Sequence, residues 1–147
     1  MLQLLDQNTA VSQAELGGRK SIQLSDGADR VLVKLDVFYN LNCLNTIRKY
    51  LFRDYYGSSN DTNDHEQQVV VNGCIDMIRQ SLMCHGDIAI ETYRWKADRL
   101  PPWPIFHIEH ECRNWDSILQ WAKEHHVPSL QGGILKHPIH GISTDAK

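Results

Sequence analysis

The stretch "LNCLNTIRKYL" at residues 41–51 has a second, altered copy in "NGCIDMIRQSL" at residues 72–82. Apolar residues recur at spacings of three and four in both copies, which is typical of amphipathic helices. The repeat predicts two helices that pack about a local pseudo-two-fold axis. The alternative is a chance match between two amphipathic helices, which explains the shared Cys-x3-Ile-Arg-x2-Leu spacing less well than a true repeat does. The identical pairs are Cys43 and Cys74, Ile47 and Ile78, Arg48 and Arg79, and Leu51 and Leu82.

The apolar stripes extend beyond the repeat and predict the helix boundaries. The first helix is expected over residues 37–53, with Asp36 as its N-cap, and the second over residues 70–83. The polar stretch 54–68 between them contains Gly and Ser and predicts an exposed loop. A third helix is expected to follow Asn114, whose side chain is a good cap for the run "WDSILQWAKEHH".

Extended structure is expected on either side of this helix pair. "SIQL" at 21–24 and "VLVKL" at 31–35 bracket a turn with Asp-Gly, which predicts a short hairpin. The alternation in "DIAIETYRW", 87–95, favours a strand or extended segment. "LPPWP" at 100–104 is incompatible with a helix because proline fixes its own backbone and restricts the residue before it.

These patterns predict a mainly α fold with a minor β part. It contains the pseudo-two-fold pair of helices, a C-terminal helix, a short β-hairpin and extended segments. The expected organisation is a loosely packed N-terminal arm (1–20), one domain (21–126) and a C-terminal tail that packs only in part (127–147).

Composition limits the classes of function. The 147 residues are 41% hydrophobic and 22% charged, with a net charge of -3 and no long block of one sign. Nucleic acid is therefore not expected as a partner. No apolar run approaches the ~20 residues of a membrane span, so the chain as given is expected to be soluble. The four cysteines lie in no Cys-x-x-Cys pair, and whether they are buried thiols or one of three possible sets of disulfides stays open.

Three segments together resemble the UstYa-like family of fungal secondary-metabolite (mycotoxin) biosynthesis proteins. They are "LDVFYNLNCLNTIRKYL" (35–51), "VVVNGCIDMIRQSLMCHGDIAIETYRW" (69–95) and "HECRNWDSILQWAKEH" (110–125). In that family a His-x-x-His-Cys motif precedes each repeat helix, and a His-x-Cys comes before the last helix. The resemblance covers residues 21–126.

The resemblance implies a metal-dependent oxidase, using copper, whose histidines project from one face of each repeat helix. This sequence departs from the pattern at every expected ligand, where it has Tyr39, Asn42, Val70 and Gly73. Valine and glycine offer no side-chain ligand, a neutral tyrosine with a pKa near ~10 is a poor one, and an asparagine carbonyl favours hard cations. We therefore expect no metal ligands at these positions and no cofactor. An oxidase that uses relocated histidines is a lesser alternative.

A non-oxidative cyclase or isomerase is the preferred hypothesis. A cycloaddition, Michael-type closure or double-bond shift requires proximity and a few polar groups but no redox centre. The substrate would be a reactive polyketide, terpenoid or peptide-derived intermediate. The candidate catalytic residues are Tyr39, Asn42, Asp87, Glu91 and His110, and the candidate substrate-binding residues are Val70, Gly73, Tyr93, Trp95 and Trp103.

The second hypothesis is a non-catalytic partner subunit of an active UstYa-like oxidase. The family resemblance implies that its members work in pairs, so a homodimer or a heterodimer with a sister protein is expected. It also implies a secretory-pathway lumen or a membrane anchor in a full-length protein. In such a compartment the four cysteines are expected to form two disulfides.

Overall fold

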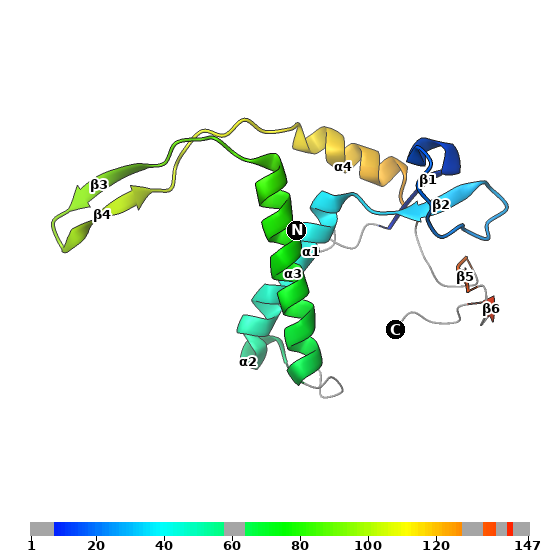
Figure 1. Ribbon diagram of the computed structural model, residues 1–147, viewed down its shortest axis with the longest axis horizontal. Helices are drawn as coiled ribbons and strands as arrows, with labels where there is room; N and C mark the ends of the chain where they lie inside the picture. Colours follow the sequence, from blue (N-terminus) through cyan, green and yellow to red (C-terminus); the bar gives the residue numbers. More distant parts are fainter. Residues whose placement is uncertain (1–7, 58–63, 128–133, 138–140, 143–147) are drawn as a thin grey trace.

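The computed structural model describes residues 8–57, 64–127, 134–137 and 141–142, and their architecture is mainly α with a minor β part, as the sequence predicts (Figure 1). The helices are α1 (Asp36–Leu51), α2 (Arg53–Tyr56), α3 (Asp64–His85) and α4 (Trp115–Glu124), with a short 3-10 helix η2 (Gln13–Leu16). The strands are β1 (Thr9–Ser12), β2 (Arg30–Val33), β3 (Thr92–Lys96), β4 (Arg99–Ile105), β5 (Lys136–His137) and β6 (Gly141–Ile142). Each strand belongs to an antiparallel pair.

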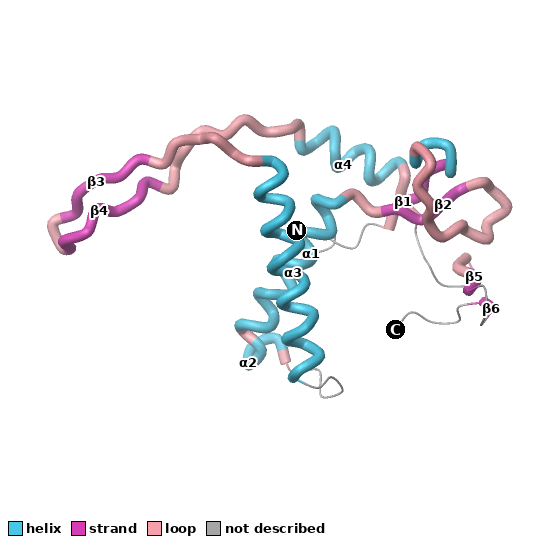
Figure 2. Tube along the Cα trace, in the orientation of Figure 1, coloured by secondary structure: helices cyan, strands magenta, loops and turns pink. Residues whose placement is uncertain are grey.

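The two repeat segments form the paired helices α1 and α3, which lie side by side (Figures 1 and 2). Cys43 and Cys74, at equivalent places in the repeat, are joined by a disulfide with their Cα atoms 4.9 Å apart. Both cysteines are buried, as are Phe38 and Val71 on the same two helices. The disulfide joins the two helices directly, and the buried side chains show that each helix also contributes to the apolar interior.

The helix ends differ from the sequence prediction in two places. Asp36 is not the N-cap of α1: it lies in the first turn, where its carboxylate accepts a hydrogen bond of 2.7 Å from the Asn40 amide. A carboxylate in that turn still interacts favourably with the helix dipole. The predicted loop 54–68 is wrong at both ends, because its first residues belong to α2 and its last to α3. Neither α2 nor the first turn of α3 carries the apolar stripe from which a helix is recognised. Residues 58–63 of the predicted loop lie outside the described part of the chain.

The predicted loose packing of the N-terminal arm is wrong for β1. This strand pairs with β2 in the register Thr9↔Val33, and the buried Thr9 hydroxyl donates a 2.8 Å hydrogen bond to the Val33 carbonyl. On its other side, the Ala10 N–H donates to the His125 carbonyl at 2.9 Å. The start of the chain is thereby tied to the end of α4.

The hairpin predicted for residues 21–24 and 31–35 exists in reduced form. Gln23 and Val31 form an isolated bridge, and the Leu24 N–H donates to the Arg30 carbonyl at 2.9 Å, whereas the regular ladder of β2 is with β1. A small core forms around these segments. It consists of buried Ala10, Leu24 and Val127 with half-buried Leu32, Ile134 and Leu135, so the described part of the predicted tail packs in part.

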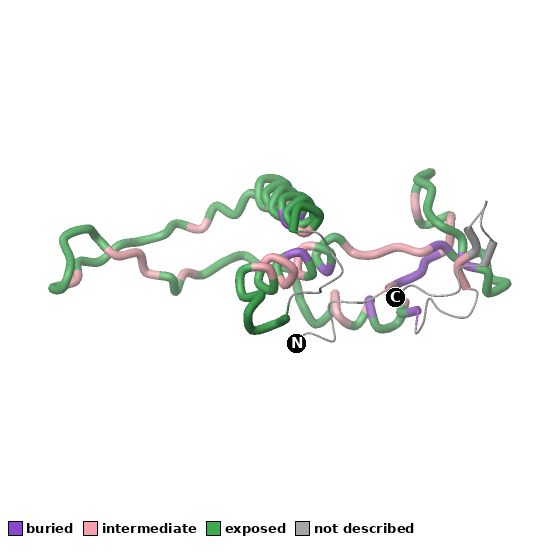
Figure 3. The backbone as a smooth tube through the Cα atoms, turned by 90° about the horizontal axis from the view of Figure 1, so that it is seen from below, coloured by how far each residue is buried: buried purple, intermediate pink, exposed green. Residues whose placement is uncertain are grey.

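An antiparallel hairpin, here called the β3–β4 arm (residues 92–105), stands apart from the rest of the molecule (Figures 1 and 3). The strand predicted for residues 87–95 begins only at Thr92. The proline-rich stretch is non-helical as predicted and forms most of β4, which is possible because a two-stranded ladder leaves one edge of each strand unpaired. Most of the arm is exposed.

Helix α4 begins as the sequence predicts. The Asn114 side chain accepts a 3.0 Å hydrogen bond from the Ser117 N–H, which satisfies one free donor of the first turn. The Trp115 ring lies 5.8 Å from the buried Phe38 ring of α1. Within the described ranges, no helix combines the length and the apolar character that a membrane crossing requires.

Candidate functional site

The main candidate site is an open groove of about 710 Å³ between the first half of α1, the last turns of α3 and the start of α4. Most of its wall is apolar, and its polar groups come from α1, from the last turns of α3 and from the base of the β3–β4 arm. We call it the α4 groove. Its apolar lining is Leu35, Val37, Leu41, Leu44, Ile78, Leu82, Trp115 and Ile118, and its polar lining is Asp36, Asn40, Ser81, His85, Asp87, Cys112 and Arg113.

Asp87 lines this groove and contacts a second predicted catalytic residue, His110, which is not itself part of the lining. Its Oδ2 lies 2.5 Å from His110 Nδ1, and its Oδ1 accepts a 2.9 Å hydrogen bond from the Ala89 N–H. The Ala89 N–H and then the His110 ring hold the pKa of Asp87 below its usual value, so the carboxylate is ionised near neutral pH. An ionised carboxylate only accepts hydrogen bonds, which places the imidazole proton on Nδ1 and leaves Nε2 to exchange protons.

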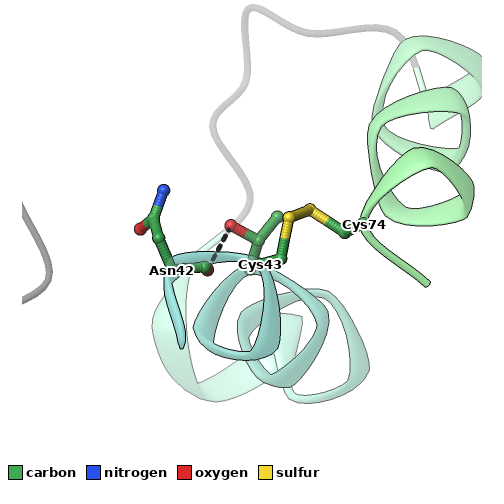
Figure 4. Close-up of a disulfide and its surroundings, with 4 residues drawn as sticks. Asn42, Cys43 and Cys74 are labelled. Atoms are coloured by element: carbon green, nitrogen blue, oxygen red, sulfur yellow. Dashed lines mark hydrogen bonds between the residues drawn. A yellow bond between two sulfur atoms is a disulfide. The ribbon is translucent and has the colours of Figure 1, made fainter. Parts of the chain in front are cut away.

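The three predicted site residues nearest the disulfide are not gathered around a cavity. Tyr39 is 45% exposed, and Asn42 is exposed with its side chain directed away from the Cys43–Cys74 bridge (Figure 4). A Cβ added to Gly73 would meet no atom within 4 Å, so this glycine faces open space. Neither groove described here is lined by Tyr39, Asn42 or Gly73.

Val70 lines a second open groove of about 580 Å³, at the opposite end of the helix pair. A few lining residues of the two grooves occupy equivalent positions of the repeat. Tyr50 and Ser81 line one each, and their separation of 31 residues is that of Cys43 and Cys74. The second groove has fewer apolar lining residues than the α4 groove, and its charged residues are Lys49, Arg53 and Glu66.

The remaining predicted residues lie on or beside the β3–β4 arm. Glu91, Tyr93 and Trp95 are exposed. The half-buried Trp103 ring is covered by the arm's own cations, with Lys96 Nζ at 4.4 Å and Arg99 Cζ at 4.2 Å from its centroid. None of the four predicted residues lines either groove, and their role in catalysis or substrate binding stays a prediction.

Comparison with known proteins places this arrangement in a family. The family model described as "Mycotoxin biosynthesis protein UstYa" matches residues 7–125, which includes both repeat helices, the arm and α4. The chain belongs to the UstYa family. The family match begins before β1, whereas the sequence analysis expects the domain to begin at residue 21.

Curated UstYa relatives are fungal proteins named as oxidases. The UstYa family oxidase aprY of Aspergillus flavus is 32% identical over 77% of this chain and 35% of its own length. For phomYc' of Diaporthe leptostromiformis the identity is 37%, over 74% of this chain and 44% of the relative. VicYc of Bipolaris victoriae is 33% identical over 67% of this chain and 95% of the relative. The chain thus spans less than half the length of the first two relatives, and no solved structure matches it.

The residues present do not fit the copper site that the UstYa resemblance implies. Val70 and Gly73 offer no donor atom, and Asn42 points away from the facing helix (Figure 4). His107 and His110 lie in a segment without helical structure, so their spacing does not put both imidazoles on one helix face. Over the residues whose placement the structure gives, no three His, Cys, Asp or Glu side chains gather as a metal site would require.

Several groove residues were not predicted as part of a site. Cys112 and Arg113 line the α4 groove although the sequence analysis assigned no site role to either, and the same holds for Ser81 and His85 of α3. The sequence did contain a signal for them, since "CHGD" ends one helix and "HECRN" precedes the next, and both are rich in reactive side chains. What the sequence lacks is the information that these two helix ends meet.

Proposed function

We propose that this UstYa family member is a non-oxidative cyclase or isomerase in fungal secondary metabolism. Its substrate would be a largely apolar, carbonyl-containing polyketide, terpenoid or peptide-derived intermediate bound in the α4 groove. The observation that supports this most directly is the Asp87–His110 pair, because Asp87 lines the largely apolar α4 groove and holds the His110 imidazole at the edge of that groove.

The pair provides the groups for a proton-transfer reaction without a redox step. His110 Nε2 takes a proton from carbon next to the substrate carbonyl, and the ionised Asp87 stabilises the imidazolium that forms. The enolate then either regains the proton at its far carbon, which shifts a double bond, or adds to an enone of the same molecule, which closes a ring. His110 returns the proton in both cases, so substrate and product have the same mass. Arg113, which also lines the groove, is a candidate counter-ion for the enolate oxygen.

The test uses chelator-treated protein and the late intermediate of its biosynthetic pathway. We expect a product of unchanged mass in water, and incorporation of deuterium at the migrating position in heavy water. His110→Gln should slow this reaction about 10²–10⁴-fold, as for loss of a general base. Asp98→Asn, which changes an exposed carboxylate at the tip of the arm, is the matched control. A product lighter by two hydrogens whose formation depends on added copper would falsify the proposal.

A second candidate function, the non-catalytic partner subunit, is favoured by the exposed apolar side chains of the arm region. Ile88 and Leu100 are each more than nine-tenths exposed, and Trp95 is 77% exposed. A lone two-stranded hairpin is only marginally stable in water, so such an arm is expected to pack against another chain, either a second copy or a sister protein.

Co-expression with a sister oxidase distinguishes the two functions. A partner subunit raises the activity of the sister protein, and Trp95→Ser combined with Leu100→Ser abolishes both the association and the increase. His110→Gln should have no effect on that increase. If the sister's activity is unaffected by this chain, the partner function is excluded.

A further inference from the structure

Two cysteines flank the β3–β4 arm without a partner in the described structure. Cys84 lies in the last turn of α3, and Cys112 lies shortly before α4, in the wall of the α4 groove. Both are exposed, in contrast to the buried Cys43 and Cys74. They therefore lie where the chain leaves the helices to form the arm and where it returns.

The register of the arm brings these two chain segments together. β3 and β4 pair Thr92 with Ile105, and the same one-to-one register, continued toward the helices, sets Asp87 opposite His110. The 2.5 Å contact between Asp87 and His110 is found at that position. This contact keeps the two sides of the arm close to each other near the end of α3.

Cys84 and Cys112 follow this contact on either side. Cys84 precedes Asp87 by three residues and Cys112 follows His110 by two, so even an extended chain would keep each Cα within about 11 Å and about 7 Å of those residues. The final helical turn shortens the first span further, since a helix rises only about 1.5 Å per residue. Both cysteines therefore lie near the Asp87–His110 contact at the base of the arm.

The backbone around them is free to close the remaining gap. Residues 86–91 and 106–114 have neither helix nor strand structure, so no ladder must break when they shift (Figure 2). Gly86, next to the end of α3, has a positive φ of 47°, a conformation that glycine adopts without steric cost. A disulfide requires Cα atoms about 4.4–6.8 Å apart, and this segment can supply the movement.

We propose that Cys84 and Cys112 form a second disulfide, which closes the base of the β3–β4 arm beside the α4 groove. The Cys43–Cys74 bridge shows that the folded chain accommodates oxidised cysteines, and the exposed pair is more accessible to the same oxidant. The oxidant is a small-molecule or protein disulfide. One thiolate attacks it and releases a donor thiol, and the other thiolate then attacks the mixed disulfide and releases the second. The chain loses two protons and two electrons, which the donor disulfide gains.

A tryptic map without reductant tests the proposal on the wild-type chain, because each of the four cysteines falls in a different peptide. Cys84 lies in residues 80–94 and Cys112 in residues 100–113. After air or glutathione oxidation and alkylation, we expect these two peptides joined, two hydrogens lighter than their sum, alongside the peptides of Cys43 and Cys74 joined in the same way. The map is made on the monomer band of a non-reducing gel.

Alkylated Cys84 and Cys112 in a chain whose Cys43 and Cys74 are bridged would overturn the proposal. A link between the two peptides that occurs only in a covalent dimer band would overturn it as well. In Cys112→Ser, Cys84 should be alkylated or remain as a mixed disulfide with the oxidant, with no link to another cysteine of the same chain, while the Cys43–Cys74 linkage is retained as the internal control. A link from Cys84 to another cysteine of the same chain in that variant would also contradict the pairing. These results do not depend on whether the α4 groove is catalytic.

Discussion

The Cys43–Cys74 bridge is expected to contribute a large part of the stability of the helix pair. It closes a loop with a sequence separation of 31 residues. The chain-entropy relation gives about 3.7 kcal/mol of unfolding free energy for a loop of that length. At about 2–4 °C per kcal/mol for a chain of this size, loss of the bridge should lower the melting temperature by roughly 10 °C.

The measurement compares three forms in a background with Cys84→Ser and Cys112→Ser, so that a reductant acts on one disulfide only. They are the oxidised chain, the same chain reduced, and a variant with Cys43→Ala and Cys74→Ala. Reduction keeps both buried sulfur atoms, whereas the alanine variant also removes them. The first difference in melting temperature reports the cross-link, and the second reports packing.

The alanine variant should melt at the same temperature with and without reductant, which shows that the reductant acts through this bridge. A loss of less than about 1 kcal/mol on reduction would refute the reasoning, since typical disulfides contribute about 2–4 kcal/mol. It would mean that the unfolded chain is already restricted without the bridge, so that the cross-link removes little of its entropy.

Four further predictions test packing, capping, backbone and charge. Phe38→Ala should lower the unfolding free energy by about 3–5 kcal/mol in urea titration, because the side chain is 1% exposed; a loss below about 1 kcal/mol would contradict its place in the core. Asn114→Ala should cost about 1 kcal/mol through loss of the α4 cap, and an unchanged urea midpoint would show that the cap contributes nothing. Gly73→Ala should raise stability by about 0.5–1 kcal/mol, since the position is helical and open, and destabilisation would reveal a contact there. The folded-state pKa of Asp87 is lowered, so its stabilising effect is complete above the unfolded pKa of about 3.9 and is lost as the pH falls through the folded value. The urea midpoint should therefore fall more steeply below pH 4 in the wild type than in Asp87→Asn, and equal slopes would contradict this.

The fold was predictable where its cause is local. The stripes of the repeat lie within single helices, so periodicity alone located α1 and most of α3. The strand β1 was missed because "TAVS" is short and its burial depends on β2, about twenty residues later in the chain, and on the end of α4. The start of α3 was missed for a local reason. Its first residues are polar and carry no apolar stripe, yet the helix extends through them.

The site was predictable only as a set of separate residues. Asp87 and His110 were both candidates from the sequence, but their pairing depends on a hairpin register that no local pattern specifies. Tyr39, Asn42 and Gly73 were chosen by position in the family motif, and the structure places them on exposed faces of the helix pair. A motif position conveys which helix face a residue occupies in the family, but not whether that face is covered in this chain.

The two grooves lie at opposite ends of the helix pair, and the segments outside the repeat explain why they differ. Two pairs of equivalent repeat positions, Tyr50 with Ser81 and Asn40 with Val71, contribute one residue to each groove. At one end α2 and the charged side chains Lys49, Arg53 and Glu66 complete the lining. At the other end α4 adds apolar side chains and the base of the arm adds Asp87 with its partner His110. Among the residues that the structure describes, an acid–base pair next to apolar surface is therefore found at the α4 end. Neither the apolar wall of α4 nor the contact that joins Asp87 to His110 belongs to the repeat, so the repeat alone would not reproduce this site.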